Sequence, residues 1–214
     1  MVLYYSILSF FWAFFVALFA IPSIIQVAHK KQLLDIPSNR RIHQIDTPRL
    51  GGLAIFAGFI SSLMLFGDIN VSIQKLIAST IIIFFIGLKD DMVSVSAFKK
   101  FFMQILATSI LVFLGDLRID NFQGVLGIGE LPEGMSYFFT LIVVIGITNA
   151  FNLIDGLDGL AGSLTILVCL IYSTIFLLYG NGKYDAEVLM SFCLIGSVLA
   201  FLRYNIDKAE IFMG

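Results

Sequence analysis

Charged residues are scarce in this sequence. Asp, Glu, Lys and Arg make up 13% of its 214 residues, whereas a soluble globular domain carries about 25%. Hydrophobic residues make up 59% of the chain and gather in long apolar runs. This shortage of charge excludes a single soluble core and predicts an all-α integral membrane protein.

Cysteine and histidine are also rare, with two residues of each. Cys169 and Cys193 lie inside apolar runs, where a thiol usually serves as a small packing residue, and they form no disulfide framework. With only His29 and His43 as nitrogen ligands, a zinc site is not expected. The first residues lack a basic segment, which predicts an uncleaved helix and not a signal peptide. The net charge of -2 gives no indication of nucleic-acid binding.

Seven apolar runs predict a bundle of about seven transmembrane helices. The runs are Val2 to Val27, Leu50 to Phe66, Val71 to Leu88, Phe101 to Leu114, Met135 to Phe151, Leu160 to Tyr179 and Val188 to Leu202. No internal repeat or domain boundary is visible, so residues 1–214 are expected to form one transmembrane domain. The 22 Phe residues indicate lipid-facing packing, with an aromatic-lined groove for a lipid chain as the alternative.

The distribution of Lys and Arg predicts the orientation of the bundle. Ten of the 13 lie in the loops after the odd-numbered runs or after the last run. The other three are Lys75, near the start of the third run, and Arg118 and Lys183, in the even-numbered loops. Because cytoplasmic loops carry an excess of cations, the odd-numbered loops are expected in the cytoplasm and the N-terminus outside. The polar residues described next would then all lie at the cytoplasmic surface.

The stretch from Asn149 to Gly162, which reads NAFNLIDGLDGLAG, contains the densest polar pattern. If it is helical, the spacing of Asn152, Asp155 and Asp158 places them near one face. Three glycines repeat the spacing and would let a backbone or a phosphate come close; they are Gly156, Gly159 and Gly162. An acid at bilayer depth costs about 2.5–3.5 kcal/mol, which favours a functional site over the alternative of a Gly-rich turn with a polar cap.

Two further loops are rich in charge. The first runs from Asp35 to Gly52 and contains a cationic cluster: Arg40, Arg41, His43 and Arg49. This cluster is either the ordinary positive-inside signal or a clamp for phosphate, which Arg binds in bidentate fashion.

The second loop places Asp90 and Asp91 side by side at the end of the third run. Adjacent carboxylates repel, by about 1 kcal/mol at 4 Å in water and about 4 at an effective dielectric of 20, so a cation is expected beside them. Either Lys89, Lys99 and Lys100 supply it, or a magnesium ion does, since Mg²⁺ takes carboxylate oxygen together with substrate phosphates.

The three motifs together resemble those of the polyprenyl-phosphate N-acetylhexosamine-1-phosphate transferases, glycosyltransferase family 4. The matching stretches read PSNRRIHQIDTPRLGG, GLKDDMVSVSAFKKFFMQ and NAFNLIDGLDGLAG. The resemblance implies a bacterial inner-membrane enzyme that transfers a sugar 1-phosphate from a UDP-sugar to polyprenyl phosphate and releases UMP. It also implies Mg²⁺, with Mn²⁺ as a substitute, and is compatible with a homodimer. The sequence Pro-Arg-Leu-Gly-Gly from Pro48 to Gly52 resembles the branch of the family that uses UDP-N-acetylglucosamine more than the branch that uses the muramyl-pentapeptide donor.

The resemblance also implies roles for individual residues. The catalytic residues would be Asp90, Asp91, Asn152 and Asp155. The substrate-binding residues would be Arg40, Arg41, His43, Arg49, Lys100, Gly156, Leu157, Asp158 and Phe212. Of these, Phe212 would lie against the uracil, and Lys100 belongs to a Lys-x-x-x-Gln motif that ends at Gln104. The metal would be held by Asp90, Asp91 and Asp155.

The family places its main magnesium-binding aspartate directly after the Phe-Met-Gly that here ends at Gly214. We therefore expect the chain to stop before the family's last spans and to be nearly inactive as it stands. Two alternatives remain at this point: an ion-coupled membrane transporter, and a non-catalytic member of the family.

Overall fold

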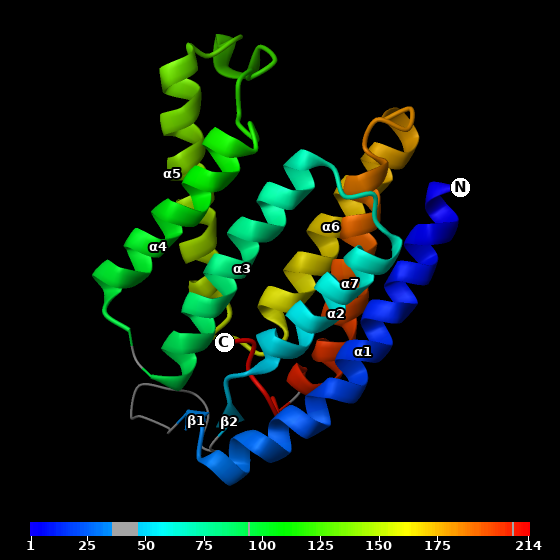
Figure 1. Ribbon diagram of the computed structural model, residues 1–214, viewed down its shortest axis with the longest axis vertical. Coiled ribbons are helices and arrows are strands. Elements are labelled where there is room, and N and C mark those ends of the chain that lie inside the picture. The colour runs from blue at the N-terminus through cyan, green and yellow to red at the C-terminus, as the bar shows by residue number, and fades with distance from the viewer. Residues whose placement is uncertain (36–46, 94, 207) are drawn as a thin grey trace. The chain divides into compact units, whose positions relative to one another are not determined.

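The computed structural model describes residues 1–35, 47–93, 95–206 and 208–214 (Figure 1). The predicted all-α, multi-span architecture is confirmed, because a helix lies at the place of each predicted span. The helices are α1 (Val2–Lys31), α2 (Gly51–Phe66), α3 (Val71–Met92), α4 (Ala97–Ser109), α5 (Glu133–Ile154), α6 (Leu160–Tyr179) and α7 (Asp185–Asn205). Among the described residues, six helices are long and apolar enough to cross a membrane, one of them being α4 with its continuation to Leu114. The 16-residue α2 is apolar but shorter.

The remaining elements are short. They are the antiparallel strands β1 (Leu34–Asp35) and β2 (Thr47–Pro48), a π-helical turn η1 (Ile110–Leu114) that continues α4, and a 3₁₀ turn η2 (Val125–Gly127). An isolated antiparallel bridge between Asn121 and Glu130 encloses η2 in the segment between α4 and α5.

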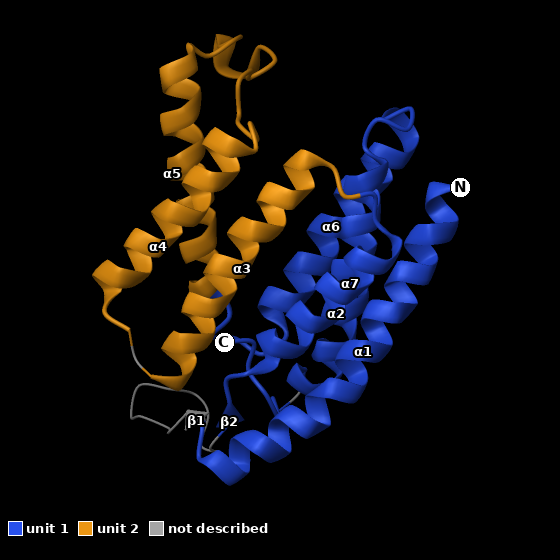
Figure 2. Ribbon diagram, in the orientation of Figure 1, with its two compact units in different colours: residues 1–68, 154–214 blue, residues 69–153 orange. Residues whose placement is uncertain are grey.

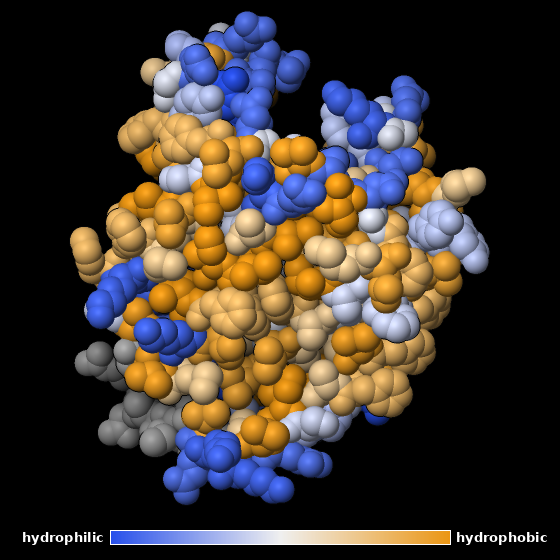
Figure 3. All heavy atoms as spheres, in the orientation of Figure 1, coloured by the Kyte–Doolittle hydropathy of each residue, from blue (hydrophilic) through white to orange (hydrophobic). Residues whose placement is uncertain are grey.

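The chain divides into two compact units (Figure 2). Unit 1 comprises Met1–Asp68 and Ile154–Gly214, and therefore contains α1, α2, α6 and α7. Unit 2 comprises Ile69–Leu153, with α3, α4 and nearly all of α5. Hydrophobic side chains cover the flanks of the helices, and hydrophilic ones gather toward the helix ends (Figure 3).

In unit 1, α7 packs against α1, α2 and α6 and has more buried residues than any other described helix of the unit. Small residues let these helices approach closely, as is usual between membrane helices. A Cβ added at Gly58 of α2, for example, would lie 2.7 Å from the Ala13 carbonyl oxygen of α1. The largest fully buried side chains of the core include Ile21, Phe201 and Ile211. The last of these lies beyond α7, so the segment after α7 is part of the folded core.

In unit 2, α3 begins at a side-chain cap, because Asn70 Oδ1 accepts the Ile73 N–H at 2.9 Å. The start of α5 is tied to the segment that precedes it. Ser136 Oγ donates to the Ile119 carbonyl at 2.7 Å, and the Ile119 N–H donates to Thr140 Oγ1 at 2.9 Å.

Candidate functional site

The residues predicted to form the site fall into three sets. Unit 1 carries Arg49, Asp155, Gly156, Leu157, Asp158 and Phe212. Unit 2 carries Asp90, Asp91, Lys100, Gln104 and Asn152. The predicted anion-clamp residues Arg40, Arg41 and His43 lie outside the described residues.

The acidic residues of unit 1 lie on a turn. The expectation of one continuous helical face fails for Asp155 and Asp158, because α5 ends at Ile154 and α6 begins only at Leu160. Gly159 closes the turn with a left-handed φ of 71°, a conformation that glycine adopts without steric cost. The alternative of a Gly-rich polar turn is therefore correct as to local structure, and it leaves the function open.

The segment 208–214 runs beside this turn and donates backbone N–H groups to both of its carboxylates. Asp155 Oδ2 accepts the Gly214 N–H, and Asp158 Oδ2 accepts the Ala209 N–H, each at 3.3 Å. Hydrogen bonds to an ionised carboxylate fix its direction as well as its charge. Both acids are thus oriented by the main chain that follows α7.

Sequence analysis missed Asn205, the last residue of α7. Its side chain is only 4% exposed. The Asn205 Oδ1 accepts the Gly159 N–H at 2.8 Å, while its Nδ2 donates to the Ile211 carbonyl at 2.9 Å. One side chain therefore joins the acidic turn to the segment 208–214. The only signal in the sequence was an amide at the end of an apolar helix.

Residues 48–52, at the end of the first charged loop, bind the segment 208–214 through main-chain hydrogen bonds. The Phe212 N–H donates to the Pro48 carbonyl at 2.8 Å, and the N–H groups of Gly51 and Gly52 donate to the carbonyls of Phe212 and Met213 at 2.9 and 2.6 Å. These donors belong to the first turn of α2, which would otherwise lack acceptors. A Cβ at Gly51 would lie 2.7 Å from the Phe212 carbonyl oxygen, so the close approach depends on glycine.

Burial raises the pKa of the Asp155 carboxyl to about 6. The Gly214 N–H and the positive charge of Arg49 act in the opposite direction and favour the ionised form. Desolvation outweighs them, since a partly buried charge loses its hydration. Among the described residues, the Gly214 N–H and Arg49 therefore offset the cost of ionising Asp155 only in part.

The other predicted residues of unit 1 are more open. Gly156 is exposed and Leu157 is 52% exposed, while Phe212 is partly buried. Side chains of α7 and of the residue that follows it pack against the other two glycines of the motif. A Cβ at Gly159 would lie 2.9 Å from the Ile206 side chain, and one at Gly162 would lie 2.6 Å from the Leu202 side chain. Close packing therefore occurs at two of the three glycines, but against side chains, whereas the approach of a backbone or a phosphate stays a prediction.

In unit 2, Asp90 is held at both carboxylate oxygens. Its Oδ2 pairs with Lys100 Nζ at 2.7 Å, and its Oδ1 accepts the Val95 N–H at 2.8 Å. The lysine alternative for the cation beside the acidic pair is therefore observed, in the form of Lys100. The neighbouring Asp91 is partly exposed.

One helical turn after Lys100, Gln104 of α4 binds Asn149 of α5. Asn149 Nδ2 donates to Gln104 Oε1 at 3.1 Å, and Gln104 Nε2 donates to Asn149 Oδ1 at 3.5 Å. Asn152 lies in the last turn of α5 and is exposed. The acidic pair and the amides of unit 2 are thus linked through α4.

The family model for glycosyl transferase family 4 matches residues 73–214, which is about two thirds of the chain. The chain belongs to this family. The match includes the acidic pair, the turn after α5 and the segment 208–214.

Several curated proteins resemble this family-4 chain. A probable undecaprenyl-phosphate N-acetylglucosaminyl 1-phosphate transferase of Bacillus subtilis is 35% identical over 210 residues, covering 97% of this chain and 58% of the relative. A decaprenyl-phosphate N-acetylglucosaminephosphotransferase of Mycobacterium tuberculosis is 34% identical over 212 residues, covering 92% and 52%. A phospho-N-acetylmuramoyl-pentapeptide-transferase of Helicobacter acinonychis is 31% identical over 238 residues, covering 97% and 67%. The chain thus spans about half the length of the first two relatives.

The donor atoms of this family-4 chain fit a magnesium ion better than a softer metal. Carboxylate oxygens are the preferred ligands of Mg²⁺, and Asp155 and Asp158 supply such oxygens at the turn after α5. Within the described parts of the chain, no three residues among His, Cys, Asp and Glu gather as a ready-made metal site. The carboxylates of unit 1 alone would therefore need phosphate or water oxygens to complete a coordination shell.

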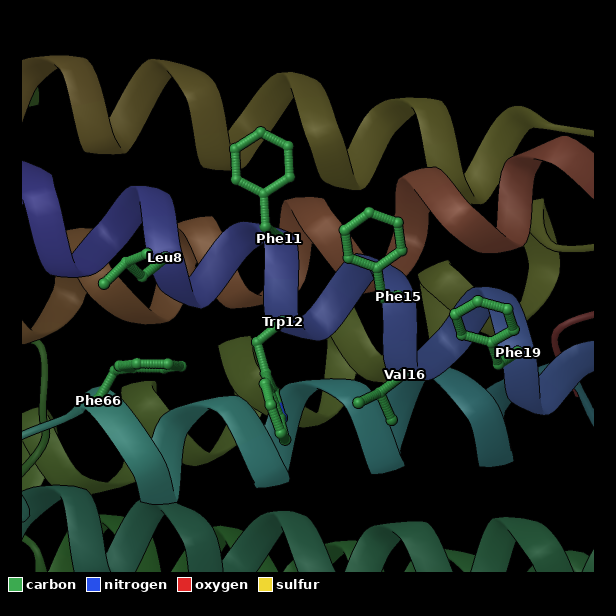
Figure 4. A pocket seen from close by; sticks show the side chains of 7 residues that line it. All are labelled: Leu8, Phe11, Trp12, Phe15, Val16, Phe19 and Phe66. Atoms are coloured by element: carbon green, nitrogen blue, oxygen red, sulfur yellow. The ribbon is translucent and has the colours of Figure 1, made fainter.

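An apolar groove of about 580 Å³ runs along unit 1 (Figure 4). Six of its lining residues come from the stretch of α1 between Leu8 and Phe19, and the seventh, Phe66, is the last residue of α2. Its Trp12 directs the indole N–H to Ser61 Oγ at 3.3 Å. The groove lies toward the opposite end of α2 from Gly51, so it takes no part in the polar site.

Proposed function

We propose that the protein transfers N-acetylglucosamine 1-phosphate from a UDP-sugar to a polyprenyl phosphate and releases UMP. The observation that carries the proposal is the convergence of Arg49, Asp155, Asp158 and the segment 208–214 at one end of unit 1, in a chain of family 4. The reaction would be an early membrane step of cell-envelope polysaccharide synthesis at the bacterial plasma membrane.

The chemistry explains why such a site needs both cations and carboxylates. A phosphate oxygen of the lipid attacks the phosphorus that carries the sugar, a new pyrophosphate bond forms, and the bond to UMP breaks. Two anionic groups must approach each other, so the protein's work is positioning and offsetting charge. Arg49 and Lys100 are the cations of the described site residues that serve this purpose.

Asp90 and Asp155 have different proposed roles. Asp90 orients the attacking lipid phosphate or accepts its proton, with Lys100 at 2.7 Å holding it in place. Asp155 would contribute an oxygen ligand to Mg²⁺, for which Mn²⁺ can substitute. When bound, the ion supplies positive charge to the phosphate oxygens. Asn152 would provide an amide for the same groups.

The donor side is proposed to lie at the acidic turn of unit 1. Gly156 and Leu157 are exposed residues, and Asp158 is oriented by the Ala209 N–H. Phe212, whose main chain is fixed on both sides by β2 and α2, would present its ring to the uracil. The names of the Bacillus and Mycobacterium relatives support an N-acetylglucosamine donor.

The test is UMP release by the complete protein made from its native gene, purified in detergent. UDP-N-acetylglucosamine, UDP-N-acetylgalactosamine and the muramyl-pentapeptide donor would each be supplied with undecaprenyl phosphate. We expect UMP release with the first donor, dependent on the lipid and abolished by EDTA. A transporter would release no UMP, and a protein without catalysis would release none with any donor.

A further inference from the structure

Gln104 is a buried amide within a membrane-spanning helix. Its side chain is 6% exposed, and both polar atoms of the amide bind the amide of Asn149. The two side chains exchange hydrogen bonds, each acting once as donor and once as acceptor. A carboxylate has no donor, so only a second amide reproduces this arrangement with the same shape.

The position of Gln104 on α4 links this pair to the acidic motif. Lys100 lies four residues earlier, and residues four apart share a helix face. Lys100 reaches Asp90 of α3, whereas Gln104 reaches Asn149 of α5. One face of α4 therefore contacts the acid on one neighbour and the amides on the other.

Two sets of side-chain hydrogen bonds tie α5 to other parts of unit 2. The first, at Ser136 and Thr140, fixes the start of the helix. The second is the amide pair at Asn149. Side chains near the end of α5 are largely exposed, with Leu153 at 83%. The location of Asn152, three residues after Asn149, therefore depends on the second tie.

We propose that Gln104 and Asn149 are positioning residues, which hold the last turn of α5 so that Asn152 keeps a fixed place relative to the Asp90–Lys100 pair. The proposal rests on the proposed function. It differs from a plain packing role, in which the amide pair would stabilise the bundle without affecting the reaction.

The test uses shape-matched variants of the complete protein. Gln104→Met and Asn149→Leu each remove the amide with little change in volume. The exchange Gln104→Asn with Asn149→Gln keeps one amide on each helix and the same combined length. Thr140→Val serves as the control, since it removes a hydrogen bond from the first tie of α5.

We expect Gln104→Met and Asn149→Leu to lower kcat by about 10- to 100-fold, because a displacement of about 1 Å has effects of this size, while the KM for the UDP-sugar stays close to the wild-type value. The double variant Gln104→Met with Asn149→Leu should be no slower than the slower single variant, as expected for one coupled unit. The exchanged pair should recover most of the rate. Thr140→Val should lower the melting temperature and leave kcat unchanged.

Hydrogen exchange of the backbone provides a second readout that needs no activity. Residues 148–154 should exchange faster in Gln104→Met than in the wild type, and at the wild-type rate in Thr140→Val. The proposal is overturned if Gln104→Met lowers only the melting temperature, or if Thr140→Val lowers kcat equally. If the wild type releases no UMP, the proposed function is wrong. If hydrogen exchange at residues 148–154 is the same in Gln104→Met as in the wild type, the positioning of α5 is refuted independently of the function.

Discussion

The two units hold their polar residues by different means. In unit 1, side chains bind main-chain atoms: Asp155, Asp158 and Asn205 each contact a backbone group of the acidic turn or the segment 208–214. In unit 2, the polar site residues also bind one another through their side chains, as in Lys100 with Asp90 and the amide pair of α4 and α5.

This difference suggests that the geometry of the polar residues is held more rigidly in unit 1 than in unit 2. A backbone group stays in place when a neighbouring side chain is replaced, so the turn of unit 1 is built to keep one geometry. A side-chain pair changes when either partner changes. We therefore expect substitution of Asn205, which joins main-chain groups of unit 1, to cost stability. Substitution of Gln104 or Lys100 in unit 2 should alter the reaction more than the stability.

The largest expected effect is that of Asp155→Asn. In the complete protein, this change should lower the rate of UMP release by about 1,000-fold, because removing one fixed electrostatic group from a reaction centre has effects of this order. Asp185→Asn, at the exposed first turn of α7, is the matched control and should retain the wild-type rate. Nearly full activity in Asp155→Asn would show that the turn carries no chemistry.

Asn205→Leu tests the main-chain framework of unit 1 directly. The change leaves the Gly159 N–H and the Ile211 carbonyl without their buried partner, which should lower the free energy of unfolding by about 2–4 kcal/mol. Asn205→Asp keeps the acceptor for the Gly159 N–H but places a carboxylate oxygen against the Ile211 carbonyl at a buried site, so it should not restore the stability. Unfolding in detergent measures both. The contrast between the units breaks down if Asn205→Leu proves no more destabilising than Gln104→Met.

A smaller effect concerns pH. Because the pKa of Asp155 is raised from 3.8 to about 6, the folded protein holds this proton more tightly than the unfolded chain. The resulting stability is fully present below about pH 4 and is lost as the pH rises through about 6. Two pKa units correspond to about 3 kcal/mol, and partial exposure reduces this to about 1–2 kcal/mol.

Asp155→Asn should therefore be more stable than the wild type at pH 8 by about 1–2 kcal/mol, with the difference vanishing near pH 4. Thermal unfolding in EDTA across this range measures the difference. Added Mg²⁺ should narrow the gap at pH 8 by stabilising the wild type alone. A constant difference at all pH values would contradict the assigned pKa.

The smallest expected effect is that of Lys100→Met on stability. The side chains of Lys100 and Asp90 are 37% and 25% exposed, so their ion pair should contribute less than about 1 kcal/mol to unfolding. UMP release should nevertheless fall clearly in this variant. A loss of stability as large as that of Asn205→Leu would show that unit 2 is no more adjustable than unit 1.

The helices could be predicted from the sequence because each depends on a local property. An apolar run long enough to span a bilayer identifies its helix without knowledge of its neighbours, and the predicted run from Leu160 to Tyr179 coincides with α6. The π-helical turn after α4 gave no such signal, since its residues are as apolar as the helix before it.

The site was only partly predictable because its contacts are long-range. Spacing alone suggested a helix for Asp155 and Asp158, whereas hydrogen bonds to residues 59 and 51 positions away accompany a turn. Asn205 binds Gly159 across 46 positions, a contact that no local pattern reveals. By contrast, Lys100 was considered as a partner of the acidic pair because it lies only ten residues from Asp90.

The first turn of α2 has a consequence for how the protein is made. Gly51 and Gly52 donate to carbonyls of residues 212 and 213, which are synthesised 161 positions later. At about 5–20 residues per second, these acceptors arrive roughly 8–30 s after the helix they cap. During biosynthesis, the first N–H groups of α2 therefore lack these acceptors until the chain has been made as far as residues 212 and 213. The hydrogen bonds from Gly51 and Gly52 to residues 212 and 213 can form only after α7 has been made. Assembly of the site is therefore one of the last events in the folding of unit 1.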